Sequence, residues 1–159
     1  MKMTLTELEV IRQECRTLVN QRSWISAATA TIPLPGLDVG ADVALMTRLI
    51  EQINQKFGLT EHDVAQLDDQ TRQRLWVIIS SLGSSMIGRY ASKELIILAL
   101  KRVGVRMVSK QAAKLIPLLG TALAAGVSYG AMRYLGNSHI EDCYQVLKQA
   151  IEQEQAADK

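Results

Sequence analysis

Aromatic residues are scarce in this sequence, and neither sign of charge dominates it. Phe, Trp and Tyr make up 4% of the 159 residues, although 48% are hydrophobic, and the formal net charge is +2. The apolar content is therefore mostly Leu, Ile, Val and Ala, which favours closely packed helices. So small a net charge does not indicate a general polyanion binder. Nucleic acid is not an expected partner, because no stacking aromatic residues lie near the basic segment.

Cysteine and histidine are also few, and their spacing excludes the common metal and redox motifs. Cys15 and Cys143 are far apart in the sequence, and isolated thiols are typical of a reducing compartment such as the cytoplasm. His62 and His139 both fall inside sequences of the capping-box type, so we expect them at exposed first-turn positions. No nucleophile has a base beside it. We therefore expect no catalytic activity, which also excludes a small hydrolase, and no bound metal or cofactor.

A nucleotide-binding loop of the form Gly-x4-Gly-Lys-Ser/Thr is missing as well. Residues 83–88 have the glycine spacing, but Arg89 and Tyr90 follow them. They replace the lysine that reaches the phosphates and the hydroxyl that binds magnesium. Residues 1–22 alternate acidic and basic side chains without an apolar core, so we expect no secretory signal there.

The sequence does contain helical periodicity along its whole length. Apolar residues recur every three, four or seven positions, and no stretch alternates as a β-strand would. We therefore expect one compact all-α domain over residues 1–159, with an amphipathic helix at 1–22 and a frayed polar tail at 152–159. The predicted buried faces comprise Leu8, Ile11, Cys15, Leu18 and Ile25; Val39, Val43, Met46, Ile50, Ile53 and Phe57; Leu75, Ile78, Ile79, Leu82 and Met86; and Ile140, Cys143 or Tyr144, Leu147 and Ile151.

Short-range capping signals predict where these helices begin and end. Gly58 fits the position just after a helix, where left-handed backbone is needed. Gly136 and Asn137 are expected to end a helix, and residues 138–141 are expected to open the last one. The other predicted caps are Thr4 with Glu7 or Thr6 with Glu9, Thr60 with Asp63, and Asp68 or Asp69.

Two apolar segments carry the same break, Ile-Pro-x-x-Gly, at residues 32–36 and 116–120. Proline removes a backbone donor and pushes the preceding residue out of the helical conformation, so each segment is expected to form a hydrophobic helix-(Pro-x-x-Gly)-helix hairpin. Asp38 and Asp42 are expected to cap the helix that follows the first break. They would need further ligands at useful spacing to act as a metal or acid–base pair, and the sequence offers none. The expected turn and cap residues are Pro33, Pro35, Gly36, Asp38, Asp42, Pro117 and Gly120.

These two segments carry a resemblance to a known family. Residues 28–59 resemble the helical C-terminal domain of immunity-related GTPases, and they also look like a bacterial domain of unknown function that follows Era-like GTPase domains. The shared pattern is an apolar helix, Ile32-Pro33-Leu34-Pro35-Gly36-Leu37, then Asp42-Val43-Ala44-Leu45, and finally Phe57-Gly58-Leu59. Residues 115–120 followed by 124–130 look like the second apolar hairpin of that family.

The resemblance covers most of the chain and has implications for both fold and partners. It implies an all-helical module that associates with membranes or with other protomers while a linked G domain hydrolyses GTP. Because the nucleotide loop is missing here, such a G domain would belong to another part of the same chain or to a neighbouring chain.

Five basic residues follow the fully apolar stretch 95–100, with no acidic residue among them. Four of them recur at every fourth position, so in a continuous helix they would lie within ~120° of one side. This set is either a solvated surface or a site for an anionic partner, such as lipid headgroups or an acidic protein surface. We call it the basic stripe: Lys101, Arg102, Arg106, Lys110 and Lys114.

Small residues are spaced four apart at Ala122, Gly126 and Gly130, which is typical of a close helix contact in water or of a pairing face in lipid. They lie in an uncharged run, residues 115–132, whose length reaches the lower edge of a membrane span.

Together these features predict a non-catalytic regulatory or interaction module of the GTPase-associated type. We expect it to be cytoplasmic and associated with the inner face of a membrane, or to assemble with other proteins or with copies of itself. The alternative is an integral membrane protein in which residues 24–37 and 115–132 enter the bilayer as re-entrant hydrophobic hairpins.

Overall fold

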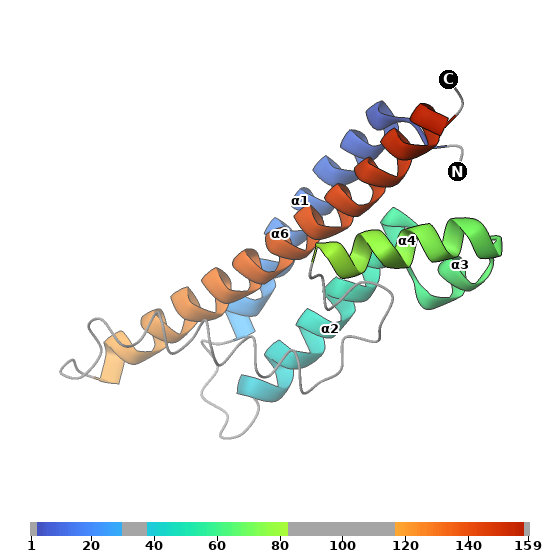
Figure 1. The fold of residues 1–159 in the computed structure, drawn as a ribbon. Helices are drawn as coiled ribbons and strands as arrows, with labels where there is room; N and C mark the ends of the chain where they lie inside the picture. Colours follow the sequence, from blue (N-terminus) through green and yellow to red (C-terminus); the bar gives the residue numbers. More distant parts are fainter. Residues whose placement is uncertain (1–2, 30–37, 83–116, 158–159) are drawn as a thin grey trace.

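The computed structural model describes residues 3–29, 38–82 and 117–157, with the side chains of residues 29, 38–42 and 117–124 left out of the description. All regular elements in these ranges are α-helices (Figure 1). The expected all-α class is therefore confirmed. None of the described helices has a stretch long and apolar enough to cross a membrane. The helices are α1 (Leu5–Thr29), α2 (Asp38–Phe57), α3 (Glu61–Ala65), α4 (Asp69–Ser81) and α6 (Pro117–Ala157).

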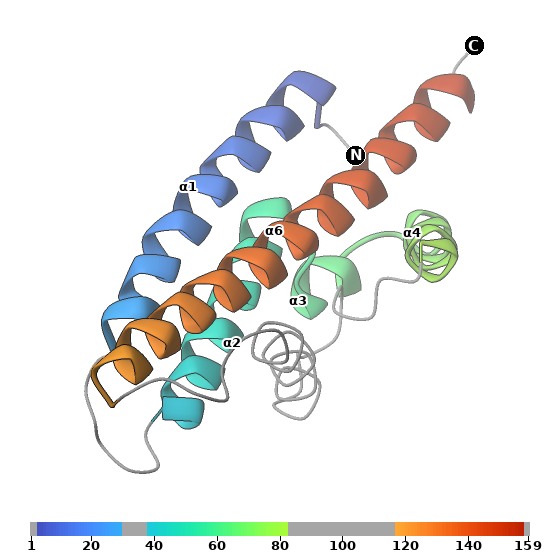
Figure 2. The same ribbon diagram turned by 90° about the vertical axis from the view of Figure 1, so that its left-hand side faces the viewer.

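Two long antiparallel helices organise the fold. α1 and α6 lie side by side, and both chain termini are at the same end of this pair (Figures 1 and 2). α2 packs against both helices, and α4 crosses α6 (Figure 1). The end of the pair where α1 stops and α6 begins is therefore remote from the termini.

Hydrogen bonds between close neighbours start the helices where the sequence predicts. The Glu7 N–H donates to the Thr4 hydroxyl over 3.2 Å, and the Thr4 N–H donates to the Glu7 carboxylate over 2.8 Å. This reciprocal pair is a capping box. α3 opens with a second one, in which Thr60 and Asp63 exchange the same two bonds. Asp68, the first of the two candidates, is the residue that caps α4.

The end of α2 follows its predicted signal. Gly58 has a φ of 65°, which L side chains rarely adopt. The N–H of Leu59 then donates back to the Asn54 carbonyl over 2.8 Å, and the N–H of Gly58 donates to Gln55 over 3.2 Å. Leu59 is buried, so this turn is fixed both by hydrogen bonds and by packing.

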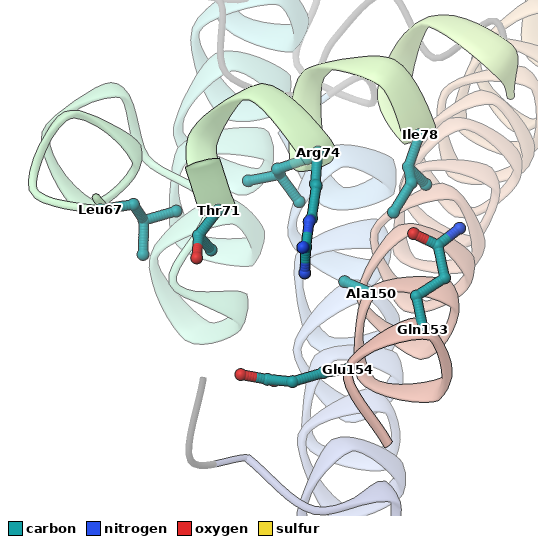
Figure 3. Close-up of a pocket in the computed structure, with 8 residues that line it drawn as sticks. Leu67, Thr71, Arg74, Ile78, Ala150, Gln153 and Glu154 are labelled. Atoms are coloured by element: carbon teal, nitrogen blue, oxygen red, sulfur yellow. The ribbon is translucent and has the colours of Figure 1, made fainter. Parts of the chain in front are cut away.

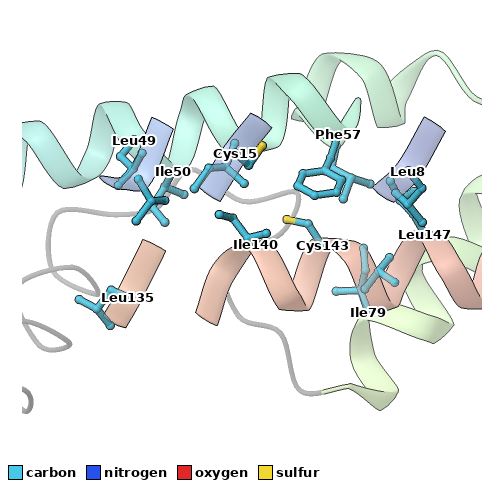
Figure 4. Close-up of a cluster of buried hydrophobic side chains, with 14 of the residues drawn as sticks. Leu8, Cys15, Leu49, Ile50, Phe57, Ile79, Leu135, Ile140, Cys143 and Leu147 are labelled. Carbon is cyan, nitrogen blue, oxygen red and sulfur yellow. The ribbon is translucent and has the colours of Figure 1, made fainter. Parts of the chain in front are cut away.

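The core lies where α1, α2 and α6 meet, and α4 closes one side of it (Figure 4). The described part of the predicted α2 stripe is buried, as are the predicted residues of α6. In α4 the prediction is confirmed for three residues, but Leu82 is 38% exposed because it lies at the end of the helix as its C-cap. Met86 lies outside the described residues. The core side chains labelled in Figure 4 are Leu8, Cys15, Leu49, Ile50, Phe57, Ile79, Leu135, Ile140, Cys143 and Leu147.

The predicted apolar face of α1 is wrong in its second half. Ile25 is 44% exposed, whereas Ser23 and Ser26 are fully buried. The buried face continues from Val19 through these two serines because α6 packs against that side. The hydrophobic spacing could not show this, since it counts serine as a polar and therefore exposed residue.

The predicted helix end at Gly136 and Asn137 is also wrong. α6 passes through both residues and through the expected capping box at 138–141 without interruption. Gly136 is buried, and a Cβ atom built on it would lie 2.8 Å from a methyl carbon of Val19 and 3.2 Å from one of Leu49. The glycine is needed for the close approach of α1 and α2 to α6, and tertiary packing overrides its local tendency to end a helix.

Candidate functional site

A buried polar cluster joins α2 to α6 inside the apolar core. The Nε2 atom of His139 lies 2.8 Å from the Oδ1 of Asn54, and the Cys143 sulfur lies 3.6 Å from the same ring nitrogen. The sulfur is also 3.7 Å from Asn54 Oδ1. His139 and Cys143 are fully buried and Asn54 almost so. By residue type this is a Cys–His–Asn set, which in other folds supplies a nucleophile, a base and an orienting amide.

The His139 ring was expected at the surface, and that prediction is wrong. Because the helix does not end at Gly136, the ring lies on the side of α6 that faces Asn54. With Asn54 accepting through its carbonyl oxygen, Nε2 carries the proton. Nδ1 is then bare, buried and without a hydrogen-bond partner among the described residues. Burial lowers the pKa of His139 to about 4, since the charged ring would lose its hydration.

The same burial keeps the thiols protonated. Burial raises the pKa of Cys143 well above its ordinary value, and it raises the pKa of Cys15 to about 11. The reactive form of cysteine is the thiolate, which this environment disfavours. A substrate would also have to enter the core. The cluster is therefore structural: it fixes the register of α2 on α6. His62, in contrast, is exposed as expected, with its Nε2 2.9 Å from the Gln66 side-chain nitrogen.

Charged side chains tie α1 to α6 at the end with the termini. Arg12 donates two hydrogen bonds to the Glu141 carboxylate, at 2.7 and 2.9 Å, and a further one to Glu9 at 3.2 Å. The hydrogen bonds to Glu141 are the largest cause of the raised pKa of Arg12. Its guanidinium also lies 4.3 Å from the centre of the Tyr144 ring. This arrangement is an interhelix clamp, in which both terminal nitrogens of the Arg12 guanidinium are engaged. Its Nε is buried and has no hydrogen-bond partner among the described residues.

A small hollow lies between α4 and α6 (Figure 3). Its volume is about 40 Å³, enough for only a few water molecules and far below the several hundred Å³ of typical ligand sites. Within the described residues, no three His, Cys, Asp or Glu side chains are grouped to hold a metal ion. The hollow is lined by Leu67, Thr71, Arg74, Leu75, Ile78, Ala150, Gln153 and Glu154.

The residues predicted to bind a partner lie in the part of the chain that the structure does not describe. All five residues of the basic stripe are in the segment 83–116, and Pro33, Pro35 and Gly36 are in the segment 30–37. Their roles stay predictions.

The remaining predicted turn and cap residues lie in the first turns of α2 and α6, where the structure describes the backbone but not the side chains. Asp38 and Asp42 are in the first turns of α2, Pro117 is the first residue of α6, and Gly120 follows it within the same helix. Because the side chains of Asp38 and Asp42 are not described, their capping roles also stay predictions.

The small-residue row does not mark a close contact at Gly126. No atom lies within 4 Å of a Cβ atom built on Gly126, which is exposed, so the expected helix contact is wrong there. The close approach occurs instead ten residues later, at Gly136. No sequence signal distinguishes the two glycines, because the difference depends on which side of α6 faces α1 and α2.

Two curated proteins are similar to nearly the whole chain. Interferon-inducible GTPase 5 from Bos taurus is 25% identical over 158 residues, which is 96% of this chain and 34% of the GTPase. The Rattus norvegicus protein of the same name is 23% identical over 158 residues, with the same coverage. The resemblance to immunity-related GTPases is confirmed. No family model and no solved structure gives a significant match.

The chain spans about a third of the length of these relatives. It is therefore an all-α module similar to one segment of a GTPase.

Proposed function

We propose that this chain is a non-catalytic helical module that acts together with a G domain and carries it to an anionic membrane surface. The observation that supports the G-domain part most directly is the similarity to a segment that makes up 34% of a GTPase. A G domain in the same polypeptide or in a neighbouring one would supply the nucleotide chemistry. The absence of a phosphate-binding loop from this sequence agrees with that division of labour.

The described residues give catalysis no support. The Cys–His–Asn set has the residue types of a reactive site, but it is enclosed in the core and its thiol is held protonated. The hollow beside α4 is too small for a substrate. A regulatory or anchoring role is the function class that these features favour.

The membrane part of the proposal rests on the basic stripe, Lys101, Arg102, Arg106, Lys110 and Lys114. Each Lys or Arg held near an anionic bilayer contributes about 1 kcal/mol, so five cations can outweigh a modest cost of orientation. The attraction is screened over ~8 Å at physiological ionic strength and should weaken as salt is added. Isolated thiols suit the cytoplasmic face of such a membrane.

Vesicle flotation tests this proposal. Vesicles containing phosphatidylserine should retain the protein, and the retention should fall with salt and be lost in the double variant Arg106→Glu/Lys110→Glu. The matched control is Arg48→Glu/Arg74→Glu, two exposed cations on α2 and α4 whose reversal changes the net charge equally. If both double variants lose binding equally, the effect is one of net charge and the stripe is not a site.

Assembly with copies of the chain is the second candidate role, favoured by what the family resemblance implies. Sedimentation at rising protein concentration, with and without vesicles, separates assembly from lipid binding. A carbonate wash of membranes tests the integral alternative, since it releases a peripheral protein. If neither the full-length polypeptide nor the adjacent coding sequence contains a G domain, the GTPase part of the proposal is wrong.

A further inference from the structure

The α1–α6 pair carries no charge at the end remote from the termini. No charged residue occurs between Arg22 and Asp38 or between Lys114 and Arg133. The end of α1 lies beside α6 near Ser128 and Tyr129, and the first turns of α6 extend beyond it (Figure 1). We call this end, residues 23–29 of α1 with residues 117–132 of α6, the uncharged tip.

Inside the tip, the contact between the two helices is polar. The Ser26 and Ser128 hydroxyls are 2.7 Å apart across the helix pair, and the Ser23 hydroxyl donates to the Val19 carbonyl over 2.8 Å. All three serines are buried. The Ser26–Ser128 pair crosses between the helices, whereas the Ser23 bond lies within α1. Such satisfied polar groups are compatible with a helix pair that enters lipid, where no water can replace a missing partner.

On the outer surface of the tip and next to it, the large exposed side chains are apolar or aromatic. Trp24 is 63% exposed, Ile25 is 44% exposed and Tyr134, just beyond the tip, is 60% exposed. The Trp24 ring lies against that of Tyr129, with 4.9 Å between the ring centres. At the other end of the same helix pair Leu8 is in the core and charged residues such as Arg12 and Glu141 are paired near the surface, although Val10 is 55% exposed there. We call Trp24, Ile25, Tyr129 and Tyr134 the aromatic belt.

The belt residues point in several directions and do not form one flat patch. Consecutive residues of a helix point ~100° apart, so Trp24 and Ile25 face different directions. Tyr134 follows Tyr129 by five residues, which places it ~140° around α6 and ~8 Å along its axis. α2 packs against both helices and covers one side of the pair. A flat protein surface would reach only some of the belt residues, whereas a bilayer can reach all four at one depth, because ~8 Å is about the thickness of its headgroup layer.

Two arginines bound the tip at the level of the belt. The Arg133 guanidinium donates to the Tyr129 hydroxyl over 2.6 Å and lies 3.5 Å from the Asn20 side-chain oxygen, while Arg22 donates to Gln52 over 3.2 Å. These partners are neutral, and no carboxylate within the described ranges forms an ion pair with either arginine. Their positive charges are complementary to the phosphates of a headgroup layer.

We propose that the uncharged tip enters the surface of a lipid bilayer and that the aromatic belt lies among the headgroups, as aromatic residues do at membrane interfaces. This proposal extends the membrane role proposed above. It depends on that role only in taking a membrane as the partner. It does not require anionic lipid, because the tip itself contains no charged residue that would need a lipid counter-charge. The tip therefore binds neutral phosphatidylcholine, whereas the basic stripe needs anionic lipid.

Trp24 itself can report the depth of insertion. The sequence has two tryptophans, so Trp76→Phe leaves Trp24 as the only one. With neutral phosphatidylcholine vesicles we expect its emission to shift to the blue. Lipids brominated close to the headgroup should quench it more than lipids brominated near the chain end. Unchanged emission and absence of quenching would overturn the inference.

A matched pair of variants tests the contribution of the belt to binding. Trp24→Ser should weaken partition into neutral vesicles about tenfold, as expected for removing one large apolar group from the interface. Trp76→Ser removes an exposed tryptophan from α4 and should leave partition unchanged. Tyr134→Ser is the second belt variant, in case Trp24→Ser alters helicity. If Trp24→Ser and Tyr134→Ser bind like the parent protein, the belt is not a membrane contact.

The inference and the proposed function can fail separately. Loss of anionic binding in the stripe variant, with Trp24 remaining in water, would leave the proposed function in place and overturn the insertion of the tip. Insertion of Trp24 into neutral vesicles without any anionic preference would support the tip and contradict the stripe. Self-association that Trp24→Ser abolishes in the absence of lipid would make the belt a protein interface and overturn the inference.

Discussion

Gly136 of α6 packs directly against Val19 of α1. A Cβ atom built on the glycine would lie 2.8 Å from Val19 Cγ2 and 3.0 Å from Cγ1. Valine is stiff at χ1 and cannot swing its methyl groups away at low cost. Leu49 of α2 adds a third contact at 3.2 Å. Three helices therefore approach one another closely at this position, and the absence of a side chain allows the approach.

Gly136→Ala should destabilise the protein. Overpacking of a core typically costs about 1–3 kcal/mol, and the gain in helix propensity returns less than about 1 kcal/mol. Gly126→Ala is the matched control on the same helix, because the space around Gly126 is open, and it should be neutral or stabilising. Urea denaturation measures both variants. In a Val19→Ala background, Gly136→Ala should destabilise the protein less. If Gly136→Ala and Gly126→Ala stabilise the protein equally, the close approach at Gly136 is contradicted.

The buried imidazole of His139 should make stability depend on pH. Its pKa is about 4 in the folded protein, against an ordinary value of 6.5. Between these two pH values the unfolded chain binds a proton at His139 and the folded protein does not. This contribution to stability is present in full above pH 6.5 and is lost progressively between pH 6.5 and 4, by ~3 kcal/mol in total.

Thermal or urea unfolding as a function of pH measures this loss. His139→Gln keeps an amide that can donate to Asn54 but cannot titrate, so its stability should fall less over the same interval. His62→Gln is the control, because that ring is exposed. If His139→Gln shows the same decline as the parent protein, other groups cause the pH dependence.

Asn54→Leu should be costly because it leaves the His139 N–H buried without its acceptor. A group stranded in this way typically costs about 1–3 kcal/mol. Replacing both partners, in Asn54→Leu/His139→Leu, removes the stranded donor, so the double variant should lose less than the sum of the single variants. Gln55→Leu is a nearby exposed control and should change stability by less than ~0.5 kcal/mol. Additive losses in the cycle would show that the two side chains are not coupled.

Asp38 is expected to act through its capping oxygen and not through its charge. Asp38→Asn should be nearly silent, whereas Asp38→Ala should cost ~1 kcal/mol of stability at the start of α2. Thermal melting of both variants measures the difference. A fully stable Asp38→Asn protein that no longer binds vesicles would instead make the carboxylate part of a binding site.

Several helix boundaries could be predicted from the sequence because the interactions that set them are short-range. The Thr4, Thr60 and Asp68 caps bond to groups three residues away, and the φ of Gly58 is a property of glycine itself. The all-α class follows from the same local patterns. The resemblance to immunity-related GTPases was also available from the motifs at residues 32–59 and 115–130.

Of the two candidate surfaces, the basic stripe could be recognised in the sequence, because a basic residue at every fourth position is visible without the tertiary structure. The aromatic belt was not, because it exists only where α1 and α6 pair in antiparallel register and bring Trp24 to Tyr129. Its exposure depends on which face of each helix the partner covers.

Tertiary packing decided the rest, and it did so against local signals. Gly136, Asn137 and residues 138–141 have the chemistry of a helix end and a new start, but α6 runs through them. Contacts with Val19, Leu49 and Asn54, all more than eighty residues away in the chain, keep the helix continuous and bury His139. A local pattern reports only the preference of a segment for its own neighbours. The free energy of packing three helices together exceeds that preference, and it depends on a register that no single segment contains.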